Sequence, residues 1–171
     1  MKNPNINNSN FNDPNSDNDF RDFYERDMQK IVKIERYLIN KEYQRDKTLD
    51  HIFARLSILD FEINSIVSSC EKIIDTSNDK DKLNSLSELL RKKKREKKRK
   101  ETKCQKLEEA RRKKDIYNNH CSKCEEMTFS LNYCKTQQEV NALKRDIIKE
   151  INELDRKRAE LYDLEKRIEK M

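Results

Sequence analysis

The sequence predicts an all-α protein, an elongated coiled coil of two long helices behind a disordered, Asn-rich N-terminal tail. Of its 171 residues, 42% are charged and 33% are hydrophobic, which is too few apolar residues for a thick globular core, since ordinary domains have about 45–50%. The chain has no Gly, and both prolines lie within the first 14 residues, so most of it lacks the usual turn residues. Apolar residues also recur at alternating spacings of three and four, the heptad pattern of a coiled coil.

The N-terminal segment, residues 1–18, contains eight Asn, both prolines and few apolar side chains. This composition predicts a disordered tail, and its polar start is unlike a secretory signal. Ser16, Asp17 and Asp19 carry side-chain oxygens that can cap a helix. We therefore expect the first helix to span residues 19–75.

The strongest periodic signal lies inside this first helix. Eight consecutive positions, spaced alternately three and four residues apart, are apolar or Cys, which predicts a left-handed supercoil and a seam that binds another helix. Phe53, Ile58 and Phe61 flank this seam and widen it, which indicates more than two helices or a wider partner. The seam residues are Leu49, Ile52, Leu56, Leu59, Ile63, Ile66, Cys70 and Ile73.

A polar break at residues 76–80 separates the first helix from a second one, expected over 81–171. The break is short and rich in residues that cap helices, whereas Asn118-Asn119 is a weaker candidate for an interruption. A second coiled-coil stretch is predicted at 140–171, with one extra four-residue step near Ile151. Its seam residues are Val140, Leu143, Ile147, Ile151, Leu154, Leu161, Leu164 and Ile168.

A basic segment occupies residues 91–114, with fifteen Lys/Arg and four Glu, although the whole chain has a net charge of only +6. Such a segment can hold the phosphates of a nucleic acid or of an anionic membrane surface, and it resembles a nuclear-localisation run. It can also be a solvated helix face. It has no aromatic residue on which single-stranded bases could stack. The candidate polyanion-binding residues are Arg91, Lys92, Lys93, Lys94, Arg95, Lys97, Lys98, Arg99 and Lys100.

The basic segment also affects how the helices are expected to pair. A hairpin that turns at 76–80 would place the 49–73 seam against this segment, and an apolar seam should not face a row of Lys and Arg. We therefore expect the seam to be buried against a second copy of the chain or a different coiled-coil protein.

The five cysteines do not form the even, regularly spaced set of a disulfide framework. Their number favours a reducing, intracellular compartment, cytoplasmic or nuclear. Cys121 and Cys124 form a C-x-x-C beside His120, but a Zn²⁺ site needs four ligands, and Cys104 and Cys134 do not have the spacing of a second pair. We interpret these cysteines as small apolar seam residues and expect neither a metal nor a cofactor.

Residues 106–127, KLEEARRKKDIYNNHCSKCEEM, resemble a helix of the F-BAR membrane-curving domains, in which an Ala-Lys-Lys-x-Tyr run precedes Cys and acidic residues. The similarity covers about 22 of the 171 residues, and an F-BAR domain is much longer than this chain. It implies a membrane-surface role for the basic helix, and no site residue is carried over from it.

Enzymatic functions have little support in the sequence. The absence of Gly excludes phosphate-binding loops, dinucleotide-binding turns and nucleophile elbows, and the two histidines, His51 and His120, belong to no catalytic motif. No apolar run is long enough for a transmembrane helix. We therefore predict a non-enzymatic coiled-coil scaffold or adaptor that assembles through its seams, with itself or with a partner. The alternative is a polyanion-binding protein that uses the basic helix, with no small-molecule substrate in either case.

Overall fold

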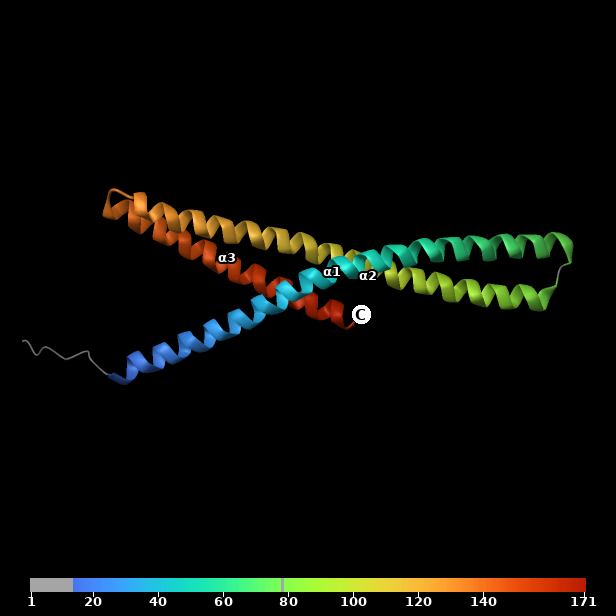
Figure 1. The fold of residues 1–171 in the computed structure, drawn as a ribbon, viewed down its shortest axis with the longest axis horizontal. Coiled ribbons are helices and arrows are strands. Elements are labelled where there is room, and N and C mark those ends of the chain that lie inside the picture. Colours follow the sequence, from blue (N-terminus) through green and yellow to red (C-terminus); the bar gives the residue numbers. More distant parts are fainter. Residues whose placement is uncertain (1–13, 78) are drawn as a thin grey trace, which may run out of the picture. The chain divides into compact units, whose positions relative to one another are not determined.

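The computed structural model describes residues 14–77 and 79–171, with side chains from Asp27 onward. In these residues all the regular secondary structure is helical: α1 (Pro14–Thr76), α2 (Lys80–Ser130), a short 3-10 turn η1 (Leu131–Tyr133) and α3 (Gln137–Glu169) (Figure 1). The all-α class is confirmed, but the prediction of two long helices is wrong, because residues 14–77 and 79–171 form three. It divides into two units, residues 1–37 and 38–171, and the packing below belongs to the second.

Helix α1 begins at Pro14, earlier than the expected start at residue 19. Proline suits the first turn of a helix, because its fixed φ is already helical and its missing N–H would have no partner there. Ser16 and Asp17 therefore lie within the helix. The rest of the expected disordered tail, residues 1–13, falls outside the described residues. The helix ends at Thr76, within the expected break.

Helix α2 starts immediately after the break. Asp79 has extended backbone angles and is the N-cap: its carboxylate accepts a hydrogen bond from the backbone N–H of Lys82 at 3.2 Å. The helix runs through Asn118 and Asn119 without interruption and ends at Ser130.

The second helix predicted over 81–171 is interrupted between Ser130 and Gln137. The reason is a capping box at the start of α3. The Thr136 hydroxyl accepts from the Glu139 N–H at 3.2 Å, and the Glu139 carboxylate accepts from the Thr136 N–H at 3.1 Å. This reciprocal pair satisfies two N–H groups that a new helix end leaves without partners, so the chain can turn here without Gly or Pro.

Helix α3 packs against the second half of α2, and Figure 1 shows the two helices side by side. Lys113 of α2 pairs with Glu160 of α3 at 3.2 Å, and Lys123 pairs with Glu150 at 2.6 Å. The partner of the higher-numbered residue on α2 has the lower number on α3, so the two helices are antiparallel.

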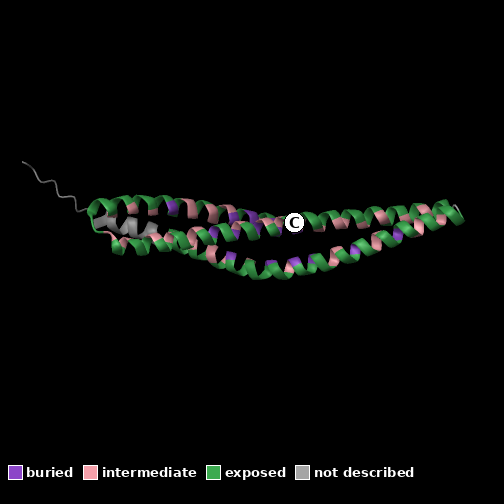
Figure 2. Ribbon diagram, turned by 90° about the horizontal axis from the view of Figure 1, so that it is seen from above, coloured by how far each residue is buried: buried purple, intermediate pink, exposed green. Residues whose placement is uncertain are grey.

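Most of the buried apolar residues of the second unit lie in one place, here called the three-helix junction. It consists of residues 38–49 of α1, 104–110 of α2 and 161–168 of α3. Elsewhere the helices bury single residues at intervals, and their outer surfaces are exposed (Figure 2). This packing of long helices gives only a thin core, as the composition predicts. The buried apolar residues of the junction are Leu38, Leu49, Cys104, Leu107, Ala110, Leu161, Leu164 and Ile168.

Among the described residues, no helix combines the length and the apolar character that crossing a bilayer requires.

Candidate functional site

The basic segment is divided between two sides of α2. One side faces α1 and is electrically matched: Lys93 Nζ lies 2.8 Å from a carboxylate oxygen of Glu62, and Lys97 Nζ lies 2.6 Å from Asp60. About one turn away the cation is on α1 and the carboxylate on α2: Arg55 donates from its Nε to Glu96 at 2.8 Å.

These contacts also fix the protonation states of the groups. The hydrogen bond to Asp60 raises the pKa of Lys97, and the hydrogen bond from Arg55 lowers the pKa of Glu96. Lys97 and Glu96 therefore both stay charged at neutral pH. The cations on this side already have partners inside the chain, so they are poor candidates for binding a ligand.

The first seam lies on this side, against α2. Leu49, Ile52, Leu59 and Ile66 are buried, while its other four members, Leu56, Ile63, Cys70 and Ile73, are partly exposed. The expectation that the seam could not face the basic segment is therefore wrong. Lysine covers apolar surface with its methylene stem and keeps the ammonium at the edge, where the carboxylates of α1 lie.

The other side of α2 carries six cations that point away from α1, here called the outward face. All six are exposed, and in the described ranges, 14–77 and 79–171, no ion pair includes any of them. Lys100, by contrast, is partly covered, as are Lys93 and Lys97. The outward face consists of Arg91, Lys92, Lys94, Arg95, Lys98 and Arg99.

Three of these cations converge on one surface hollow. Arg95, Lys98 and Arg99 line it together with Thr102 and with Met171, which follows α3. The hollow is open and has a volume of about 460 Å³. Chemically, it offers three cationic donors to an anion that approaches from solvent, and no described carboxylate side chain lines it.

The second predicted seam is used within the chain, although unevenly. Leu161, Leu164 and Ile168 are buried in the three-helix junction, and Ile151 is 44% exposed. The remaining members are partly exposed: Val140, Leu143, Ile147 and Leu154. Two buried acidic residues, Glu150 and Glu165, lie beside this seam; sequence reasoning missed them, because nothing in the spacing separates them from exposed Glu residues.

Glu150 gathers the polar groups around the C-x-x-C. Its carboxylate pairs with Nδ1 of His120 and with Lys123, and the hydrogen bonds from these two residues lower the pKa of Glu150. Cys121 and Cys124 lie partly exposed nearby as free thiols, and burial raises the pKa of Cys124. Within the described part of the chain, no cluster of three His, Cys, Asp or Glu residues is placed to hold a metal ion.

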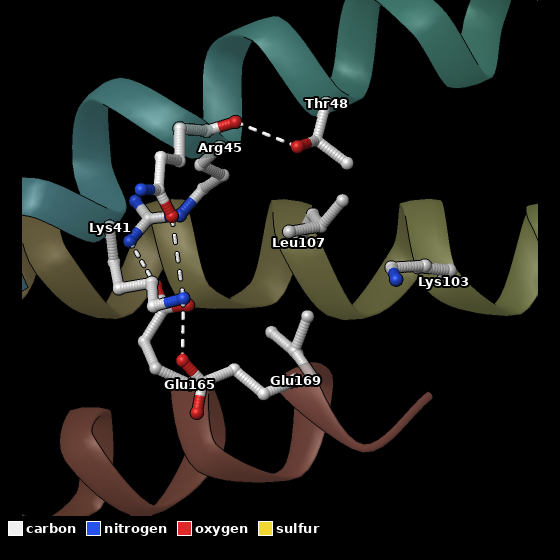
Figure 3. A pocket seen from close by; sticks show the side chains of 9 residues that line it. Lys41, Arg45, Thr48, Lys103, Leu107, Glu165 and Glu169 are labelled. Carbon is white, nitrogen blue, oxygen red and sulfur yellow. Dashed lines mark hydrogen bonds and ion pairs between the residues drawn. The ribbon is translucent and has the colours of Figure 1, made fainter.

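The three-helix junction contains a buried ion pair between Arg45 of α1 and Glu165 of α3, both of which are nearly inaccessible to solvent. Beside it, Lys41 pairs with Glu169 at 2.5 Å. The residues around these pairs line a cavity of about 120 Å³, with Leu107 at its centre (Figure 3). The two ion pairs link α1 to α3 there, and Lys103 of α2 adds one further cation to the lining.

No protein-family model matches this sequence, and no curated protein or solved structure matches it either. The similarity of residues 106–127 to an F-BAR helix therefore depends on those residues alone.

Proposed function

We propose that the protein is a non-enzymatic binding protein that holds a polyanion on the outward face of α2. One observation carries the proposal: the six cations of that face are exposed and have no ion partner among the described residues, whereas Lys93 and Lys97, their neighbours in the sequence, are matched by carboxylates of α1. A helix whose charges served only solubility would not need one side matched by carboxylates and one side left unmatched.

The arrangement of the cations supports the same proposal. Arg91, Arg95 and Arg99 follow one another four residues apart, as do Lys94 and Lys98. Like charges at this spacing repel each other on a helix. Among the described residues, no ion pair with a carboxylate offsets this repulsion on the outward face. A bound polyanion removes that repulsion and releases its own counterions, which makes the binding favourable and sensitive to salt.

The test is charge reversal on the outward face alone: Lys94→Glu, Lys98→Glu and Arg99→Glu. We expect this variant to lose at least about tenfold in affinity for heparin at physiological salt, with unchanged helicity. Lys97 is left intact, because a carboxylate there would oppose Asp60 and disturb the packing of α1 on α2.

A matched control has the same net charge. Lys135, Lys144 and Arg145 are exposed cations outside the basic segment, and their reversal to Glu should change heparin affinity far less than reversal on the outward face. Equal losses in the two triple variants would mean that net charge matters and the outward face does not, and would refute the proposal.

The second candidate function is the assembly of coiled-coil proteins, and exposed apolar residues on α1 favour it. Phe53, Ile58 and Phe61 are 48%, 50% and 75% exposed, respectively. Ile58 and Phe61 are three residues apart and share a face of the helix, and Phe53 lies eight residues before Phe61, at the edge of that face. Helix association through this side would leave the buried seam intact, whereas a partner of the 49–73 seam would have to displace α2.

Sedimentation velocity tests this second candidate. If the protein forms oligomers through α1, then Ile58→Ser with Phe61→Ser should give monomers with unchanged helicity. Ile74→Ser provides the control, because Ile74 is also exposed on α1 but lies on a different side of the helix from Ile58 and Phe61. A wild-type protein that stays monomeric at high concentration would exclude self-assembly through this face.

A further inference from the structure

We infer that the polyanion is a nucleic-acid duplex, which the outward face contacts through phosphates and without reading bases. The inference depends on the proposed function and names its ligand. It rests on three properties of the outward face: the density of its charges, the kind of cation it presents, and the side chains that are absent from its exposed positions.

The charge density of the face matches that of a duplex. Six cations occupy the nine residues 91–99, and eight steps of about 1.5 Å make this segment about 12 Å long. The helix therefore presents roughly one positive charge per 2 Å. A duplex carries one negative charge per about 1.7 Å of its axis, so the two rows of charge can neutralise each other over their common length.

The chemistry of the face favours phosphates held in a fixed array. Arg91, Arg95 and Arg99 are each about one turn apart, and a guanidinium can donate two parallel hydrogen bonds to one phosphate. Helices that insert into membranes need apolar side chains beside their cations. Between residues 91 and 102, the exposed positions other than Lys and Arg are Glu101 and Thr102, so this stretch of α2 itself has no exposed apolar residue to insert.

The same exposed positions make a reader of adenine or a single-strand binder unsuitable. None of them is an Asn or Gln, the side chains that recognise adenine in the major groove, and none is an aromatic residue on which an unpaired base could stack. Contacts to phosphates fix position and affinity but carry no sequence information. We therefore expect duplexes of unrelated sequence to bind equally well.

Fluorescence anisotropy of the full chain with labelled 20-base-pair duplexes, titrated between about 50 and 200 mM salt, tests the inference. Six phosphate contacts predict a slope of log Kobs against log salt of about −5, since each contributes about −0.9 for B-form DNA. Lys94→Gln with Arg95→Gln and Lys98→Gln should make the slope shallower by about 3 units. The control Lys135→Gln with Lys144→Gln and Arg145→Gln should leave it unchanged.

Further ligands separate the possible failures. Comparable binding of a DNA duplex and an RNA duplex, each tighter than an unstructured single strand, supports the inference, and so does binding of one duplex form alone. Tighter binding to phosphatidylserine vesicles or to the single strand than to either duplex would overturn it while leaving polyanion binding intact. Failure to bind heparin, vesicles and duplexes alike would overturn the proposed function as well.

Discussion

The three-helix junction and the α1–α2 pair around Lys97 show two ways of covering apolar residues with the same central helix. At the junction, apolar side chains from three helices bury one another and enclose the ion pair of Arg45 and Glu165. Around Lys97, two helices meet, and Asp60 and Glu62 of α1 pair with the ammonium groups of Lys97 and Lys93. The first arrangement depends on burial, whereas the second depends on charge matching at its edges.

This difference explains why one side of α2 can be so basic without unfolding the pair. Carboxylates of α1 pair with the lysines of α2 that face it, so the apolar seam of α1 tolerates a basic helix opposite it. The remaining cations have no such carboxylates within the described residues. The charge that α1 leaves unmatched is the charge that the proposed polyanion would neutralise.

Breaking the buried ion pair should have the largest effect on stability. Glu165→Ala leaves the Arg45 guanidinium buried without its carboxylate, and such a loss typically costs about 3–5 kcal/mol. Urea denaturation followed by circular dichroism should show this loss.

A double variant separates charge from packing at the same place. Arg45→Met with Glu165→Leu removes both charges and keeps apolar volume, so it should recover most of the stability. If the free energy of unfolding of Glu165→Ala equals that of the wild type within experimental error, the junction does not depend on this pair.

A smaller loss is expected in the α1–α2 pair. Leu59 is fully buried there, and its replacement by Ala should cost about 2 kcal/mol, near the lower end of the range for buried leucines, because two helices can move together to close the space. Leu164→Ala in the junction should cost more. Urea denaturation of both variants under the same conditions shows which loses more free energy of unfolding. A larger loss for Leu59→Ala than for Leu164→Ala would contradict the expected difference between the two regions.

Acidification should moderately weaken the α1–α2 pair and the contact of α2 with α3 around Glu150. Hydrogen bonds from Arg55 and from His120 lower the pKa of Glu96 and Glu150, respectively, below the ordinary value of 4.5. The unfolded chain then binds more protons, so this stability is complete above about pH 4.5 and is lost as the pH falls through the lower folded values.

Thermal melting between about pH 3 and pH 7 measures this dependence. The wild-type curve should be flat near neutrality and fall steeply in acid, and Glu96→Gln or Glu150→Gln should each fall less steeply. Equal slopes for the wild type and both variants would show that neither carboxylate is linked to folding.

Much of the fold follows from local patterns. The absence of Gly and the apolar spacing predict helices, and the break at 76–80 is where α1 ends and α2 begins. The division near Thr136 was also readable, because Thr136 and Glu139 have the spacing of a capping box, but the absence of Gly and Pro over 81–171 favoured one continuous helix. Short polar signals can therefore outweigh a long periodic one.

The two sides of the basic segment could not be predicted in the same way. Which lysines face α1 depends on where α1 lies against α2, and that register is fixed by pairs such as Lys97 with Asp60. These residues are far apart in the chain, so a single sequence gives no indication that they meet. The buried state of Glu165 has the same origin, since it depends on Arg45 of another helix.

Lysine footprinting tests the central claim most directly. Acetylation of the folded protein, read by mass spectrometry with and without saturating heparin, should show protection of Lys92, Lys94 and Lys98 by the polyanion. Lys135 and Lys144, which are exposed elsewhere, should react equally in both states. Protection confined to the outward face is the result we predict, whereas even protection of all these lysines, or none at the outward face, would contradict the account.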